Sequence, residues 1–316
     1  MSNSAIPDIY GTMSVDNKVE GSRNSPSEIA KALDQTFAWF KHYGIDLAKT
    51  RFGYYRDLYK KISEAMEASD GARWRALNKR EVFATAAEIV NCVEIATLPD
   101  SVVGDHVSKL RRYATGERFY SPSTNSSYDQ GRDIASELRI AAMFARQRLT
   151  VQLEDPADVV VKHNGEVVYI ECKRPKTVHG LARCLKRASN QFSTHRHNGH
   201  AGIAVVALDM TLVVNPNLEI VAAKNQGDAV ETVQKLLADF TRNFERDVLR
   251  YQRDFKKDAR IEAVMFWGTV VSLTDDRAID VATATRLQPQ GPHGSQAYER
   301  CRRFQSLFTM ANLHQK

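Results

Sequence analysis

The sequence contains few cysteines. Only four occur among its 316 residues, and no two of them form a CxxC pair or match the regular spacing of a disulfide-rich secreted protein. The lack of paired spacing argues against a structural zinc site and favours a reducing compartment. We therefore expect a cytoplasmic protein whose thiols serve as small core residues, at Cys92, Cys172, Cys184 and Cys301.

Long apolar runs are also missing. No stretch approaches the roughly 18 apolar residues that a membrane-spanning helix needs, and the N-terminus has no charged region followed by an apolar core. The composition, with 43% hydrophobic and 26% charged residues, excludes the disordered and fibrous classes, and no internal repeat is present. We expect a packed protein without a membrane partner, folded as about two units.

Acidic residues are absent from one long window. Between Glu171 and Asp209 the chain carries seven lysines and arginines and four histidines, while the net charge of the whole chain is only +6. Such a cluster can form a solvated helix face, but it can also bind backbone phosphates without sequence discrimination. We predict that this window contacts nucleic acid through Arg174, Lys176, Arg183, Lys186 and Arg187.

The N-terminal third has a helical pattern. Residues 1–25 are rich in Ser, Asn and Gly and predict a flexible arm. Ser27 followed by apolar residues at helical spacing predicts a capped amphipathic helix, the first of a helical domain over 26–122. Further helices are expected near 53–68, 78–97 and 100–114, and the turn-forming run 121–127 predicts a domain boundary.

Helical and strand patterns alternate after that boundary. The order predicted for 129–208 is αβββαβ, an α/β arrangement with a mixed central sheet. Its elements are a helix at 129–148, strands at 149–154, 158–162 and 166–174, a helix at 179–193 and a strand at 202–208. Later patterns predict a strand at 217–222, a helix at 228–257, a strand at 261–273 and a helix at 295–312.

Two of these strands carry charged residues that should converge. The strand period of two places Glu171 and Lys173 on one face and Cys172 on the other. Asp158 opens the preceding strand, and the turn at 163–165 would bring the two strands together. Neighbouring carboxylates repel unless a cation lies between them, and Mg2+ or Mn2+ prefers such oxygen ligands. A metal site with an adjacent ammonium is typical of phosphoryl chemistry.

The residues Pro156-Ala-Asp158 and Glu171-Cys-Lys173 resemble the signature of the PD-(D/E)xK nuclease superfamily, with one extra residue between Pro and Asp. The resemblance implies a restriction-endonuclease-like domain at 128–285, preceded by the helical domain and followed by a helical tail at 286–316. It also implies a third acidic ligand from the preceding helix, where Glu137 stands. Glu137 could equally be an exposed acid on an amphipathic helix.

The resemblance implies further site residues. Some members carry a QxxxY element on the next helix, and here Gln191 is present but His195 stands where Tyr would be. The backbone carbonyl of Cys172 would join the side chains of Asp158, Glu171 and Glu137 as a metal ligand. The catalytic set is thus Asp158, Glu171, Lys173, Glu137 and Gln191.

The function implied by the resemblance is metal-dependent hydrolysis of phosphodiester bonds. Mg2+ or Mn2+ would be the cofactor, and DNA is a more common substrate than RNA in the superfamily. Defence against foreign DNA and DNA processing are both compatible with it. Alternatives are an inactive nucleic-acid-binding module of the same fold, an RNA-directed nuclease, or an oligomerisation protein in which the helices at 228–257 and 295–312 form a dimer or partner-subunit interface.

Overall fold

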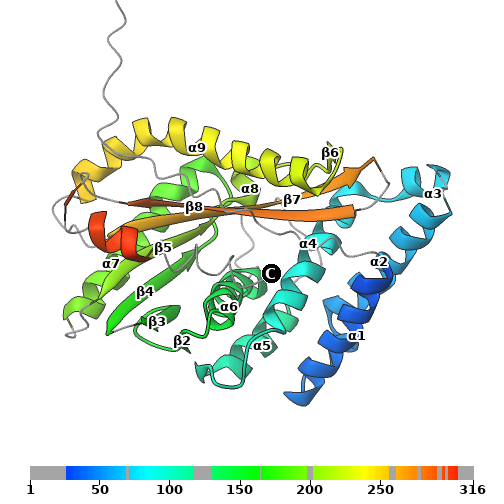
Figure 1. Ribbon diagram of the computed structural model, residues 1–316, viewed down its shortest axis with the longest axis horizontal. Helices are drawn as coiled ribbons and strands as arrows, with labels where there is room; N and C mark the ends of the chain where they lie inside the picture. The colour runs from blue at the N-terminus through cyan, green and yellow to red at the C-terminus, as the bar shows by residue number, and fades with distance from the viewer. Residues whose placement is uncertain are drawn as a thin grey trace, which may run out of the picture.

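The chain has a mixed α/β architecture. The computed structural model describes residues 26–68, 71–116, 130–163, 165–197, 202–255, 261–275, 279–289, 294–295 and 298–304. Within these ranges an eight-stranded mixed sheet is covered by helices on both faces (Figure 1). The mixed sheet confirms the predicted α/β class, while the restriction-endonuclease-like core stays a prediction. The predicted arm at 1–25 and the boundary loop at 121–127 lie outside the described residues.

The N-terminal helices begin at polar caps. Thr50, Asn78 and Asp105 accept hydrogen bonds from backbone N–H groups in the first turns of three helices, which satisfies donors that a helix leaves unpaired. The elements are α1 Pro26–His42, the 3-10 helix η1 Leu47–Lys49, α2 Arg51–Glu67, α3 Gly71–Ala76, α4 Lys79–Ile95, β1 Val103–Gly104 and α5 His106–Ala114. The predicted helices are confirmed, whereas α3 and β1 were not predicted and α5 begins later than expected.

The following segment keeps the predicted order αβββαβ. It comprises α6 Gln130–Arg146, β2 Thr150–Leu153, β3 Val159–His163, β4 Glu166–Lys173, α7 Val178–His197 and β5 Ile203–Asp209. At the turn between β3 and β4, Gly165 has a φ of 79°, a conformation that glycine adopts without a steric cost. The local turn chemistry therefore agrees with the strand pattern on either side.

The C-terminal part differs more from the predictions. It contains α8 Thr211–Val214, β6 Val221–Ala223, α9 Gln226–Phe255, β7 Ala263–Thr274 and β8 Ile279–Pro289. The strand predicted at 217–222 is wrong for most of its length, because β6 begins only at Val221. β8 was missed, although alternate burial of Ala282 and Ala284 follows the strand period. Residues 298–304 are helical, as predicted, and the rest of that helix lies outside the described residues.

The sheet topology places β4, which carries Glu171 and Lys173, between β3 and β5. The order is β1-β2-β3-β4-β5-β7-β6, and β8 pairs with β7. β3 and β4 are antiparallel, with Val159 opposite Ile170, while β4 and β5 are parallel and joined through α7. A parallel connection requires a crossover, which α7 supplies. Extending this register by one residue places Asp158, just before β3, opposite Glu171.

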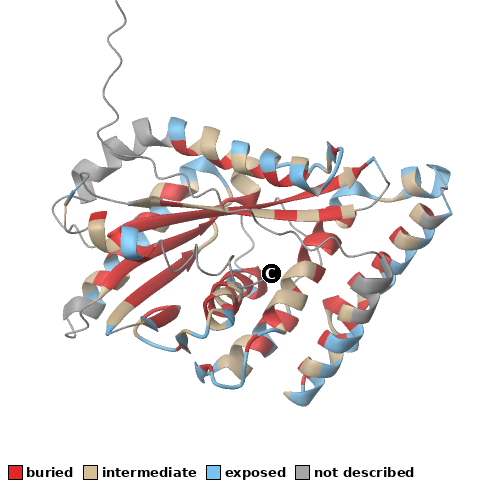
Figure 2. Cartoon of the chain, in the orientation of Figure 1, coloured by how far each residue is buried: buried red, intermediate tan, exposed pale blue. Residues whose placement is uncertain are grey.

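Two hydrophobic clusters flank the sheet, and Figure 2 shows buried residues along its strands and on the helices that face it. On one face Val159 and Ile170 belong to a cluster that includes Phe144 of α6 and Phe40 of α1. On the other face Tyr169 belongs to a cluster with side chains of α7 and α9. The N-terminal helices and the sheet therefore share one core. Among the described helices, none has the length and apolar character needed to cross a bilayer.

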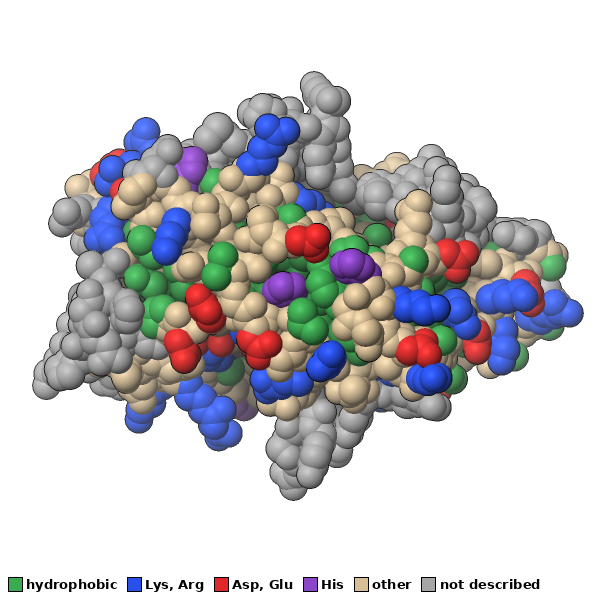
Figure 3. Space-filling model, turned by 90° about the horizontal axis from the view of Figure 1, so that it is seen from below, with side chains coloured by type: hydrophobic (Ala, Val, Ile, Leu, Met, Phe, Trp, Pro, Cys, Tyr) green, Lys and Arg blue, Asp and Glu red, His purple; other side chains and the backbone are tan. Residues whose placement is uncertain are grey.

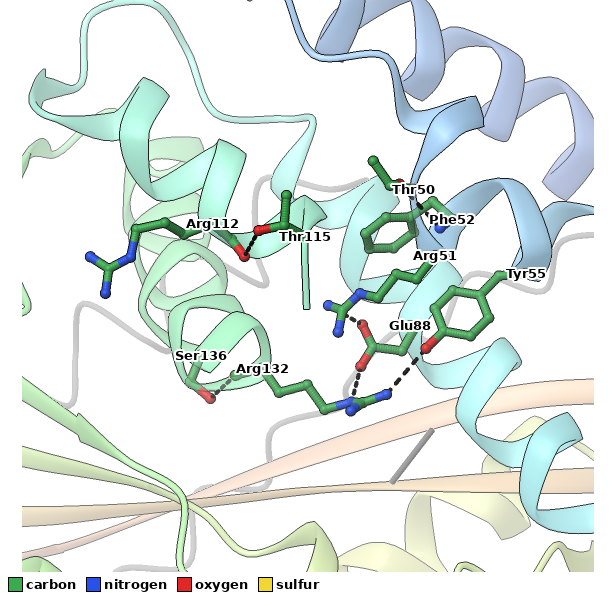
Figure 4. A network of polar contacts seen from close by, with 9 residues as sticks. All are labelled: Thr50, Arg51, Phe52, Tyr55, Glu88, Arg112, Thr115, Arg132 and Ser136. Carbon is green, nitrogen blue, oxygen red and sulfur yellow. Dashed lines mark hydrogen bonds and ion pairs between the residues drawn. The ribbon is translucent and has the colours of Figure 1, made fainter. Parts of the chain in front are cut away.

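A fully buried carboxylate ties three helices together (Figure 4). Glu88 of α4 lies 3.1 Å from Arg51 Nη2 of α2 and 2.6 Å from Arg132 Nε of α6. Arg132 also donates to the Tyr55 hydroxyl at 3.1 Å. Buried charges tolerate desolvation only when they are paired and hydrogen-bonded. This network fixes α6, which carries Glu137 just over one turn after Arg132.

Candidate active site

Asp158, Glu171 and Lys173 meet at the end of the β3–β4 hairpin. The Lys173 ammonium lies 3.1 Å from Asp158 Oδ2 and 2.7 Å from Glu171 Oε2. Asp158 Oδ2 also accepts a hydrogen bond of 2.8 Å from the backbone N–H of Cys172. The predicted faces of β4 are confirmed, because Cys172 packs with Val168 and Ile170 in the opposite layer from Tyr169. The three charged groups thus form one cluster.

Glu171 occupies an unusual environment for a carboxylate. Its side chain is 1% exposed, and Oε1 is buried with no hydrogen-bond partner within the described residues. Burial and the neighbouring Asp158 charge raise the pKa of Glu171 to about 8, against the opposing effect of Lys173. Burial alone would lower the pKa of Lys173, but the charges of Asp158 and Glu171 outweigh it and raise that pKa. Perturbed groups of this kind gather at functional sites.

Glu137 joins the cluster from α6. Burial, and secondly the neighbouring Asp158 charge, raise the pKa of its carboxyl group. Its Oε2 receives a hydrogen bond from the ammonium of Lys109 on α5, and the same ammonium lies 3.5 Å from the Asp158 carbonyl oxygen. Lys109 was not predicted. Its position depends on the packing of α5 against α6, which no short-range sequence pattern reveals.

The donor chemistry of the cluster suits a divalent cation. Glu137, Asp158 and Glu171 supply hard oxygen ligands, and the unpartnered Glu171 Oε1 is one of them. Among the described residues, however, no three His, Cys, Asp or Glu side chains are already arranged to hold a metal. Lys109 and Lys173 contact these carboxylates instead. A ligand role for the Cys172 carbonyl stays a prediction.

Gln191 lies on α7 and is half-buried. Within the described part of the chain, no hydrogen bond or ion pair joins it to Asp158, Glu171 or Lys173. Its catalytic role therefore stays a prediction. The side chain of His195 lies outside the described residues.

The predicted phosphate-binding residues fall into two groups. Arg183, Lys186 and Arg187 are exposed on α7, and Lys176 is partly exposed. Arg174 differs, because its side chain is only 3% exposed and lies 3.2 Å from Asp133 Oδ1 of α6. This contact connects the end of β4 to α6, so Arg174 is not an exposed surface cation. Basic and acidic side chains are interspersed on the face seen in Figure 3.

Comparisons of the chain with known proteins do not identify this site. No family model, curated protein or solved structure matches the chain significantly. The resemblance to the PD-(D/E)xK nucleases accordingly rests on residues of this chain: the two short motifs and the order of elements around them.

Replacing Arg183, Lys186 and Arg187 together with Ala tests the basic face of α7. We expect nucleic-acid affinity to fall for all sequences alike, and the slope of log affinity against log salt to become shallower by about 2 to 3. Fluorescence anisotropy at several salt concentrations measures both quantities. A matched triple replacement of Lys49, Lys60 and Lys61, which lie on η1 and α2, should leave the slope unchanged. An unaltered slope in the α7 variant would remove this face from the interface.

The raised pKa of Glu171 predicts a pH dependence of stability. The ordinary carboxyl value is 4.5 and the folded value is about 8, so the folded state binds the proton more tightly than the unfolded state. Stability should therefore decline as the pH rises from about 4.5 to about 8. Urea unfolding in EDTA at pH 5.5 and 8.5 measures the decline, which should be smaller in Glu171→Gln. Equal declines in both proteins would contradict the assignment.

Proposed function

We propose that this protein is a metal-dependent nuclease that hydrolyses phosphodiester bonds, with DNA as the proposed substrate. The observation that carries the proposal is the convergence of Asp158 and Glu171 on paired antiparallel strands, with the Lys173 ammonium bonded to both. Burying a charged cluster costs folding free energy. Such clusters persist where function requires them, so the burial favours a catalytic role over a solvated ion pair. The matching element order supports the same conclusion.

Each residue has a distinct task in this proposal. Mg2+ or Mn2+ held by Asp158, Glu171 and Glu137 would polarise a phosphoryl oxygen and lower the pKa of a bound water. Lys173 keeps its positive charge because its pKa is raised, so its ammonium can stabilise charge that develops on the phosphorane. Asp158 is oriented by the Cys172 N–H, which donates a hydrogen bond to its Oδ2.

The nucleic-acid backbone would be bound by the exposed cations of α7. This helix follows β4 directly, so Arg183, Lys186 and Arg187 belong to the segment that leaves the site. Phosphate contacts position a substrate without reading its sequence. DNA is proposed on the resemblance alone, and the experiment below compares it with RNA.

A panel of substrates tests the proposal. Purified protein is incubated with linear and circular double-stranded DNA, circular single-stranded DNA and RNA, each with Mg2+, Mn2+ or EDTA. Cleavage of at least one substrate with metal, and none with EDTA, is the expected result. Circular substrates distinguish internal cleavage from end degradation. Salt-sensitive binding with no cleavage of any substrate would replace the nuclease with a binding module.

A further inference from the structure

Lys109 reaches the site from outside the αβββαβ segment. It lies on α5, and its ammonium contacts Glu137 Oε2 of α6 and lies 3.5 Å from the Asp158 carbonyl oxygen. The lysine and glutamate side chains are only 18% and 14% exposed. A pair shielded from water to this degree is screened less than a surface salt bridge. The contact is therefore part of the electrostatics of the site.

The two lysines of the cluster contact different carboxylates. Lys173 contacts Asp158 and Glu171, whereas Lys109 contacts the remaining carboxylate, Glu137. Three carboxylates thus face two ammonium groups. A divalent cation that takes Glu137 as a ligand would meet the Lys109 ammonium at the same oxygen, and two cations at that separation repel.

The helix holds Lys109 firmly while its side chain can move. Leu110, Tyr113 and Ala114 of α5 are buried in the core shared with the sheet, and Asp105 caps the first turn. The backbone of Lys109 is therefore fixed by packing. The four-carbon stem of lysine nevertheless allows the ammonium to swing away through several rotatable bonds.

We propose that Lys109 is a positioning residue that holds the Glu137 carboxylate and must be displaced before a divalent cation can bind there. The inference rests on the proposed function, since it concerns the same cluster. It makes the N-terminal helices part of the catalytic unit, because α5 supplies a residue that sets how tightly the metal binds. The Lys109 ammonium and the metal ion then compete for the Glu137 carboxylate, and this competition sets the affinity for the metal.

Mn2+ binding measured without nucleic acid tests this inference. The spectrum of free Mn2+ in electron paramagnetic resonance gives the dissociation constant for wild type, Lys109→Gln, Lys109→Arg and the control Lys162→Gln. Removing one positive charge next to the ion should tighten binding about tenfold or more in Lys109→Gln. Lys109→Arg keeps the charge and should bind within about threefold of wild type. Lys162 is an exposed residue of β3 and should have no effect.

The outcomes separate the two proposals. Equal or weaker Mn2+ binding in Lys109→Gln, with binding that still depends on Asp158, overturns the role of Lys109 and leaves the metal site intact. Mn2+ binding that is absent from both wild type and Lys109→Gln, or unchanged in Asp158→Asn, overturns the metal site itself. Thermal unfolding shows whether each variant is folded. Lys109→Met, which keeps the aliphatic length, provides the same comparison if Lys109→Gln does not fold.

Discussion

Lys173→Met is expected to lower the cleavage rate by about 10^2- to 10^3-fold or more, the loss seen when one preorganised group that stabilises a transition state is removed. The ammonium lies within 3.1 Å of Asp158 and 2.7 Å of Glu171, so methionine replaces it with a neutral side chain of similar length. Single-turnover cleavage at saturating Mg2+ measures the chemical step apart from binding.

The control for this variant is Lys162→Met. Lys162 lies on β3, next to the site-bearing strand, but its side chain is exposed. The same substitution there should change the rate less than about twofold, because screened surface charges have small effects. Equal losses in Lys162→Met and Lys173→Met would show that total charge matters, and would deny Lys173 a part in the chemistry.

Glu88→Gln is expected to lower the free energy of unfolding by about 3 to 5 kcal/mol, since it leaves two buried guanidinium groups without their shared counter-charge. Arg51 and Arg132 both depend on this carboxylate and are themselves almost fully buried. Urea unfolding followed by circular dichroism measures the change. The substitution keeps the shape of the side chain, so a cavity cannot account for the loss.

Glu94→Gln provides the matched control on the same helix. Glu94 pairs with Arg139 of α6 at 2.6 Å, and the two side chains are 29% and 9% exposed, so this pair is closer to water than the Glu88 network. Arg139 also keeps its contacts with Thr283 and the Trp267 ring when Glu94 is neutralised. We expect a loss of about 1 kcal/mol. A Glu88 variant no less stable than the Glu94 variant would contradict the view that the buried network anchors α6 and, with it, Glu137.

The part of the site that was predicted from the sequence is local. Asp158 and Glu171 come together through one hairpin, whose strand period and glycine-containing turn are both visible in a short stretch of sequence. Lys173 follows on the same strand face, so its position needs no tertiary information. Glu137 was placed by the resemblance, and its nearness to Asp158 depends on how α6 packs.

The features that were missed depend on contacts distant in sequence. Lys109 and Glu137 lie 28 residues apart and meet only because α5 packs against α6. A charged residue in a helix is normally expected to be exposed. Glu88 is buried instead, because Arg51 and Arg132 both pair with its carboxylate. Arg174 was predicted to contact phosphate, but its buried side chain pairs with the exposed carboxylate of Asp133.

The order of elements was more predictable than their extent. The alternation of helix and strand periods from α6 to β5 is strong, and each predicted element lies within a few residues of the observed one. β8 was missed because three of the four buried residues among its described positions are Asp280, Ala282 and Ala284, which carry little hydrophobic signal. Its pairing with β7 is a tertiary contact that compensates for this weak pattern.

The most direct test of the account compares cleavage of circular DNA by wild type and Asp158→Asn at equal concentrations of Mn2+. Asparagine keeps the size of the side chain and removes the charge that pairs with Lys173 and that the proposed cation would require. We expect cleavage by wild type that EDTA abolishes, and a rate lower by at least about 10^2-fold in the variant. Equal cleavage by both proteins would contradict the claim that this cluster is the active site.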